Sequence, residues 1–164
     1  QSFFGLFGES NPYKRGKALE AILNRYFKSS EISVSEAITI KGDSGSGIVE
    51  QIDGVVQVRG QLYLVEIKWE QETLGRDKVA PHLVRVFSRG LAGGIVISYS
   101  DYSPAAILDC KDALRDKVIV LCKLDEVVRA LENEIELKDI LHRKIDAAVI
   151  HKNPLFIPVF ENVS

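Results

Sequence analysis

The residues best suited to chemistry are two acids and a lysine, Asp53, Glu66 and Lys68. The segment between the acids is typical of a β-hairpin with a two-residue turn at Arg59-Gly60. Continuous pairing across this turn would place Asp53 directly opposite Glu66, and Gln51 directly opposite Lys68. Because side chains alternate along a strand, Glu66 and Lys68 also share a face. The pattern predicts that three charged groups and one amide converge on a patch roughly 5–7 Å across.

These residue types indicate a divalent-metal site that acts on phosphate esters. Opposed carboxylates repel each other, and a cation between Asp53 and Glu66 would offset that cost. With the backbone carbonyl of Ile67 they would form an all-oxygen site suited to Mg²⁺ or Mn²⁺. Such a metal could polarise a phosphate and a water, while Lys68 orients the water and offsets developing charge. The alternative is a Glu66–Lys68 ion pair at the edge of the core, with Asp53 in a turn.

The hydrophobic pattern predicts an α/β fold. Its expected order is α-β-β-β-α-β-α-β-α-α, an antiparallel meander followed by a crossover into a strand buried on both faces. We therefore expect a mixed central sheet flanked by helices, with additional helices at the C-terminal end. The expected elements are a helix over 12–28 that Asn11-Pro12 begins, strands over 32–40, 48–58 and 62–69, a helix over 78–89, a strand over 93–99, a helix over 103–115 that Ser103-Pro104 begins, a strand over 117–124, and two tail helices that separate near Asn133-Glu134.

Basic residues line one side of the helix expected over 78–89. Lys78, His82, Arg85 and Arg89 form a polar stripe at helical spacing. Beside a metal site, such a row could hold the phosphates that flank a scissile bond. The alternative is an ordinary solvated helix face.

Composition favours one globular domain over 1–164. The chain is 46% hydrophobic and 27% charged, and its net charge of −2 says little about nucleic acid. The sequence has no apolar run long enough to cross a membrane, so we expect no membrane association. Cys110 and Cys122 show no metal-binding spacing, which indicates reduced core thiols and a cytoplasmic protein. The chain lacks methionine, and we expect it to be part of a longer protein; the segment 41–47, KGDSGSG, is expected to be a flexible loop.

Several segments together resemble the PD-(D/E)XK nuclease superfamily over roughly residues 12–122. GKALEAILNRYF, EQIDGVV, YLVEIKW and HLVRVFSR are similar to the restriction-endonuclease domains of Mrr-like type IV systems. The chain departs from the superfamily pattern in having Ile52 where the motif has proline. Many Mrr-like members have glutamine where this chain has Glu66.

The resemblance implies a magnesium-dependent endonuclease that cuts DNA and leaves 5′-phosphate ends. It assigns catalysis to Asp53, Glu66 and Lys68, and makes Glu20 a further acid near the metal. Gln51, opposite Lys68 in the predicted hairpin, would steady that lysine or the water. A homodimer is expected for duplex cleavage, and other modules of a longer protein are expected partners. A catalytically silent nucleic-acid-binding or scaffold domain, or the same chemistry on RNA or branched DNA, remain the alternatives.

Overall fold

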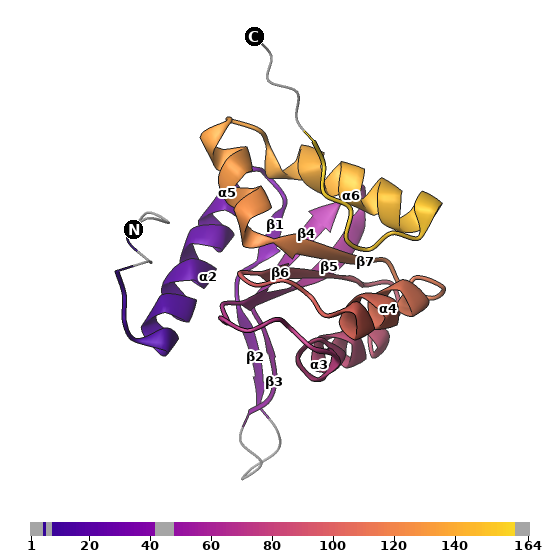
Figure 1. Cartoon of the computed structure of the whole chain (residues 1–164), viewed down its shortest axis with the longest axis horizontal. Helices are drawn as coiled ribbons and strands as arrows, with labels where there is room; N and C mark the ends of the chain where they lie inside the picture. Colours follow the sequence, from indigo (N-terminus) through magenta and orange to yellow (C-terminus); the bar gives the residue numbers. More distant parts are fainter. Residues whose placement is uncertain (1–4, 6–7, 42–47, 160–164) are drawn as a thin grey trace.

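A five-stranded mixed sheet lies at the centre of the protein in the order β1-β4-β5-β6-β7 (Figure 1). The computed structural model describes residues 5, 8–41 and 48–159. Neighbouring strands β1, β4 and β5 are antiparallel, whereas β5, β6 and β7 are parallel. The predicted α/β fold with a mixed sheet is confirmed. The strands are β1 (Ser33–Ser35), β4 (Gly54–Val58), β5 (Gln61–Lys68), β6 (Gly93–Ser98) and β7 (Ile119–Lys123).

Helices cover both faces of this sheet (Figure 1). One face packs against α2 (Pro12–Ser29), α5 (Leu124–Glu132) and α6 (Leu137–His151), and the other against α3 (Arg76–Phe87) and α4 (Pro104–Ala113). Side chains of β5 alternate between the two cores, so Tyr63 and Val65 enter the first core and Leu64 enters the second. Glu66 and Lys68 continue the Leu64 face, which faces α3.

Two predicted helix starts are confirmed by their caps. The Asn11 side chain accepts hydrogen bonds from the backbone N–H groups of Tyr13 and Lys14, and Pro12 occupies the first helical position. Ser103 caps α4 in the same way, through the N–H of Ala106. The prediction for α3 was less accurate. This helix covers Arg76–Phe87, so it begins and ends two residues earlier than the predicted 78–89, and Pro81 lies in its second turn.

Two of the predicted strands are broken. The strand expected over 32–40 divides into β1 and β2 (Ile38–Lys41), and the strand expected over 48–58 divides at Asp53 into β3 (Ile48–Ile52) and β4. Strands β2 and β3 form a separate two-stranded antiparallel sheet that extends away from the central sheet (Figure 1). The loop expected over 41–47 lies, from residue 42 on, outside the described residues.

The turn between β4 and β5 has the predicted register. Val58 pairs with Gln61, and both Arg59 (φ 51°) and Gly60 (φ 79°) have the left-handed backbone that a two-residue hairpin turn requires. Every residue of β6 is buried, as expected for a strand covered on both faces.

The C-terminal part of the chain packs against β7. The two predicted tail helices are present as α5 and α6, and beyond them the N–H of Leu121 donates to the carbonyl of Pro154 at 2.8 Å. Cys110 and Cys122 are buried and are not joined in a disulfide, as predicted. Within the described residues, none of the helices combines the length and the apolar character that crossing a membrane requires.

Candidate active site

Asp53 lies at the break between β3 and β4. The paired region of β4 and β5 ends at Gly54 and Val65, and the N–H of Asp53 donates to the carbonyl of Val65 at 3.1 Å. The Oδ2 atom of Asp53 then accepts a hydrogen bond from the N–H of Ile67 at 2.8 Å. The Asp53 carboxylate therefore accepts the hydrogen bond that a backbone carbonyl would accept if the strand pairing continued past Gly54. Because the N–H and C=O of a strand residue leave on the same edge, the carbonyl of Ile67 also faces the Asp53 edge.

Glu66 is buried, at 8% exposure, among three basic side chains. Its Oε1 lies 2.9 Å from the Lys68 ammonium, and its Oε2 accepts a hydrogen bond of 2.7 Å from the Arg85 guanidinium. The Nδ1 atom of His82 lies 3.2 Å from the same Oε2. The ion pair between Glu66 and Lys68 that the sequence left as an alternative is therefore present in the structure.

The two acids have opposite electrostatic environments. Burial raises the pKa of Asp53 to about 6, and the charges of Glu66 and Glu20 add to that effect, although the Ile67 N–H and Lys68 oppose it. Burial also acts to raise the pKa of Glu66, but His82 and Lys68 more than offset it and lower that pKa to about 2. Neighbouring acids whose pKa values are pushed apart are typical of catalytic sites.

His82 does not lie on the outer face of α3 that the basic stripe suggested. It is 1% exposed, and its Nε2 is 3.0 Å from the carbonyl oxygen of Leu64. The Nδ1 atom, although close to Glu66, lacks hydrogen-bond geometry with any described residue. This position prevents His82 from contacting a phosphate at the surface, and it makes the ring a support for Glu66 between α3 and β5.

The remaining members of the basic stripe also differ from one another. Arg85 turns toward Glu66, whereas exposed Lys78 lies 3.4 Å from Glu70. The Arg89 guanidinium donates to the carbonyl of Arg85 at 3.0 Å and lines a mainly apolar groove of about 970 Å³ that contains none of the three predicted catalytic side chains. The prediction of one continuous row is wrong, because the helix directs part of it into the core.

Asn24 was missed by the sequence reasoning and connects α2 to the site. This side chain is 4% exposed, and its amide donates to the carbonyls of Glu20 (3.0 Å) and Asp53 (3.1 Å). A Cβ atom at Gly54 would lie 2.9 Å from the Asn24 Oδ1, so the glycine allows the close approach. An asparagine among the buried positions of α2, one turn after Glu20, is the signal that could have revealed it.

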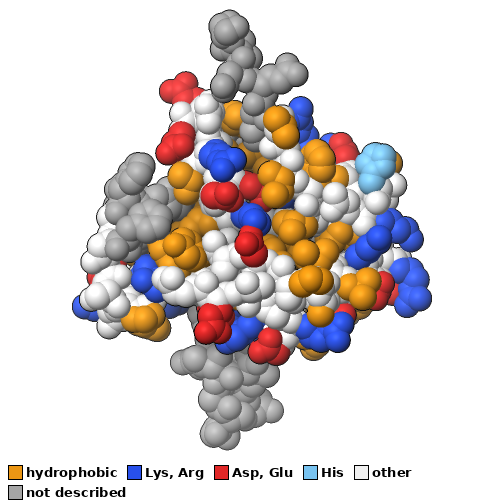
Figure 2. Space-filling model, in the orientation of Figure 1, with side chains coloured by type: hydrophobic (Ala, Val, Ile, Leu, Met, Phe, Trp, Pro, Cys, Tyr) orange, Lys and Arg blue, Asp and Glu red, His pale blue; other side chains and the backbone are white. Residues whose placement is uncertain are grey.

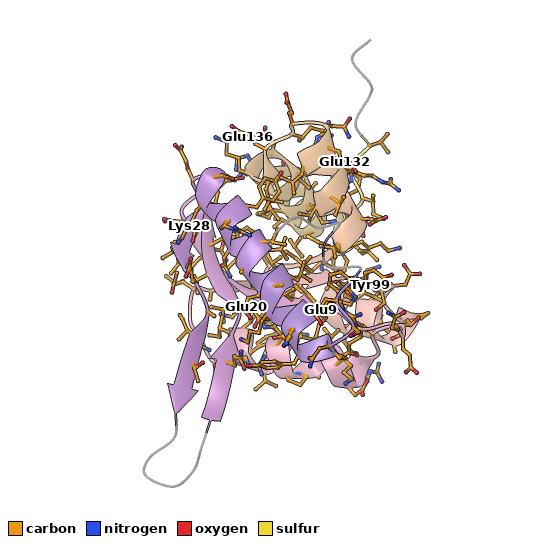
Figure 3. The ribbon with its side chains drawn as sticks, turned by 90° about the vertical axis from the view of Figure 1, so that its left-hand side faces the viewer. Glu9, Glu20, Lys28, Tyr99, Glu132 and Glu136 are labelled. Atoms are coloured by element: carbon orange, nitrogen blue, oxygen red, sulfur yellow. The ribbon has the colours of Figure 1, made fainter. Side chains whose placement is uncertain are left out.

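Glu20 lies on α2, close enough to Asp53 for its charge to act on that carboxyl group. Its carboxylate is 3.1 Å from the Lys17 ammonium, and its charge contributes to the raised pKa of Asp53. In Figure 3, Glu20 lies on the side of α2 that is nearer the β2–β3 hairpin. It lines a cleft of about 570 Å³ together with Lys17, Asn24 and Glu36.

Gln51 does not have its predicted neighbour. The residue belongs to β3 and pairs with Thr39 of β2, because the chain leaves the central sheet at Asp53. The register that the hairpin turn sets therefore ends one residue short of Asp53, and the expected Gln51–Lys68 pair does not form.

The donor atoms at this site suit a divalent cation, although the acids are not arranged as a ready-made cluster. Among the residues that the structure describes, no three His, Cys, Asp or Glu side chains are grouped to hold a metal ion. Asp53, Glu66 and the Ile67 carbonyl supply oxygen ligands, and a cation would relieve the cost of keeping Asp53 ionised beside other acids. To bind the metal, Glu66 would have to give up its contact with either Lys68 or Arg85.

The mixed sheet with helices on both faces defines an α/β protein, and the two acids and the lysine around its central hairpin are residues expected of a nuclease. A family profile described as restriction endonuclease, the Mrr-type catalytic domain, matches residues 14–131. The chain belongs to this restriction-endonuclease family, a family of DNA endonucleases, and the resemblance indicated by the sequence is confirmed.

Solved structures provide the fold comparison. The MspJI restriction endonuclease, solved with a 27-mer oligonucleotide, has 15% sequence identity and a TM-score of 0.50, with 87% of this chain and 34% of that chain covered. A protein of unknown function, AF1548, has 13% sequence identity and a TM-score of 0.49, with 64% of this chain and 55% of that chain covered. The EndoMS–dsDNA complex has 14% identity and a TM-score of 0.38, with 62% of this chain and 42% of that chain covered. This chain thus spans about half the length of AF1548. No curated protein matches the sequence.

Proposed function

We propose that this chain is the catalytic domain of a divalent-metal-dependent DNA endonuclease. The observation that carries the proposal is the convergence at the β3–β4 break. There, the Asp53 carboxylate binds the backbone of Ile67, while the flanking residues Glu66 and Lys68 pair at 2.9 Å. Metal-assisted hydrolysis of a phosphodiester uses carboxylates that hold the metal and a cation near the attacked phosphorus, and these groups can supply both.

Each residue would have a distinct role. Asp53, Glu66 and the Ile67 carbonyl would hold Mg²⁺ or Mn²⁺, which supplies Lewis acidity toward a phosphate oxygen and water. Lys68 would orient the attacking water and offset charge that develops on the phosphate. Glu20, on α2, would add negative charge near the metal that Asp53 holds. His82 would position Glu66 through its contacts with that carboxylate and with the Leu64 carbonyl.

Contacts with DNA phosphates would come from the exposed or half-buried cations of α3. Arg85 already holds an anionic oxygen of Glu66, and a metal that takes over Glu66 would release the guanidinium for a phosphate. Lys78 lies two turns before Arg85 on the same helix, and Arg89 follows shortly after the helix ends at Phe87. Figure 2 shows charges of both signs interspersed on the face it presents, which indicates that no broad basic surface covers that side.

A catalytically silent binding domain is the second candidate, and one observation favours it. Glu66 is fully engaged by Lys68, Arg85 and His82, so the site is charge-compensated without a metal. Measurement of metal binding and cleavage together separates the two candidates.

The test is a supercoiled-plasmid assay with Mg²⁺ or Mn²⁺ and an EDTA control. We expect nicked and linear products with 5′-phosphate ends from the native chain, and loss of cleavage in Lys68→Ala. Lys138→Ala, which removes an exposed lysine from α6, is the matched control and should cut normally. Intact plasmid in every metal condition would support the silent domain. Methylated, single-stranded, four-way and RNA substrates then define the substrate class.

We also propose that residues 1–164 form one nuclease domain that acts as a homodimer within a longer protein. One such site cuts one strand, so a duplex break requires two sites. Sedimentation with and without duplex DNA tests this arrangement; a monomer in both conditions that makes only nicks would contradict it.

A further inference from the structure

An aromatic stack lies at the end of β5, directly after Lys68. The ring of Trp69 stacks on that of Tyr99, with centroids 5.1 Å apart and planes inclined by 11°. The Arg15 guanidinium of α2 lies over the Trp69 ring, 5.1 Å from its centroid. Arg15, Trp69 and Tyr99 are hereafter the aromatic platform. It combines a residue of α2 with the residues that directly follow β5 and β6, which are far apart in the sequence.

The sheet places this platform at the same strand ends as the proposed catalytic lysine, on the opposite face: Lys68 pairs with Glu66 on the α3 side, whereas Trp69 packs against the core on the α2 side. Strands β5 and β6 are parallel, with Lys68 paired to Ser98, so Trp69 and Tyr99 are the next residues at the same end of the sheet. The N–H of Tyr99 donates to the carbonyl of Lys68 at 2.9 Å. The backbone of Tyr99 is thus tied to the backbone of Lys68, so the platform and the proposed catalytic lysine share one end of the sheet.

Tyr99 leaves part of its ring open to solvent. It is 39% exposed, and in Figure 3 it lies across α2 from Glu20. Trp69 is half-buried and packs against the core of the α2 face, so the stack has a fixed base and an accessible end. The Nε atom of Arg15 is buried and has no hydrogen-bond partner among the described residues. A cation–aromatic–aromatic stack of this kind presents a flat surface on which a nucleobase can stack.

We propose that the aromatic platform binds an unpaired nucleobase of the DNA strand that reaches the proposed active site, with Tyr99 as the stacking surface. The proposal rests on the proposed nuclease function for its DNA ligand, and it adds a base-stacking subsite to it. Stacking does not distinguish base identity, so the subsite would favour unpaired or unstacked strands and would not read a sequence. Duplex DNA would need local opening to use it.

Trp69 is the only tryptophan of the chain, so its fluorescence reports directly on this platform. The Lys68→Ala chain is titrated in Mg²⁺ with single-stranded (dT)₁₂ and with an abasic 12-mer of the same phosphate charge. We expect (dT)₁₂ to quench Trp69 and to bind about tenfold more tightly than the abasic strand. On the same background, Tyr99→Leu should remove this base dependence, whereas Tyr99→Phe, which keeps the ring, should preserve it.

Phe156→Leu is the matched control, because Phe156 is an aromatic residue of similar exposure (36%) on the segment after α6. It should leave (dT)₁₂ binding unchanged, and thermal melting establishes that each variant is folded. Equal binding and equal emission with (dT)₁₂ and the abasic strand would overturn the platform, even where the native chain cleaves plasmid. Base-dependent quenching without plasmid cleavage would support the platform and overturn the nuclease. Absence of both would overturn both proposals.

Discussion

Replacement of Asp53 by asparagine should stabilise the metal-free protein while it removes metal binding. Asp53 is held in a buried position beside Glu66 and Glu20, and its pKa is raised to about 6. Above that pH the folded chain must keep a carboxylate ionised in an unfavourable environment. Asparagine has no charge, and its carbonyl can still accept the hydrogen bond from the N–H of Ile67 that Asp53 accepts at 2.8 Å.

The magnitude follows from the pKa difference between the folded and unfolded states. A rise from 3.8 to about 6 is about two units, which corresponds to a cost of about 2–3 kcal/mol for the ionised folded state. Because the pKa is raised in the folded state, this cost is absent where Asp53 is protonated and develops as the pH rises from about 4 to above 6. At pH 8, Asp53→Asn should therefore melt about 4–12 °C higher than the native chain.

The assay is urea unfolding followed by Trp69 fluorescence, in EDTA, at pH 8 and pH 4. The stability gain of Asp53→Asn should be large at pH 8 and nearly lost at pH 4. Added Mg²⁺ should stabilise the native chain but not the variant, because the variant lacks the proposed carboxylate ligand of the ion. A variant that is less stable at pH 8, or a gain that is equal at both pH values, would refute the electrostatic account of Asp53.

Three further predictions concern other charges. Glu66→Gln should destabilise the protein by about 2–3 kcal/mol at pH 7, because the lowered pKa of about 2 shows that the folded state favours the ionised carboxylate. In urea unfolding, the stability difference between the native chain and the variant should shrink below pH 4.5. A stability difference that persists to pH 2 would contradict this reasoning. Arg85→Ala should strengthen the binding of Mn²⁺ by about tenfold, measured by calorimetry in the absence of DNA, because the variant loses the charged hydrogen bond that competes for Glu66. Weaker Mn²⁺ binding would show instead that Arg85 supports the metal site. Lys144→Met should cost about 3–5 kcal/mol in urea unfolding, because it leaves the buried Glu126 carboxylate, 2.8 Å from the Lys144 ammonium, without its cation. The double variant with Glu126→Met should recover most of that stability, and failure to recover would indicate a packing role for the pair.

Local chemistry made much of the fold predictable. The caps at Asn11 and Ser103 depend on neighbouring residues only, and so does the left-handed turn at Arg59-Gly60. The apolar run of β6 reports burial on both faces without reference to any partner. The acids and the lysine could be placed near one another because a two-residue turn fixes strand register for several residues on each side.

Only the tertiary structure decided how that register ends and what surrounds the site. The break at Asp53 depends on β2, which pairs with β3 and draws Gln51 away from Lys68. The inward turn of His82 depends on the packing of α3 against β5, which helical spacing alone does not specify. The support of Asp53 by Asn24 depends on contact between residues that are distant in the sequence. Local sequence sets backbone preferences over a few residues, whereas the partners of a buried charge are set by which elements pack together.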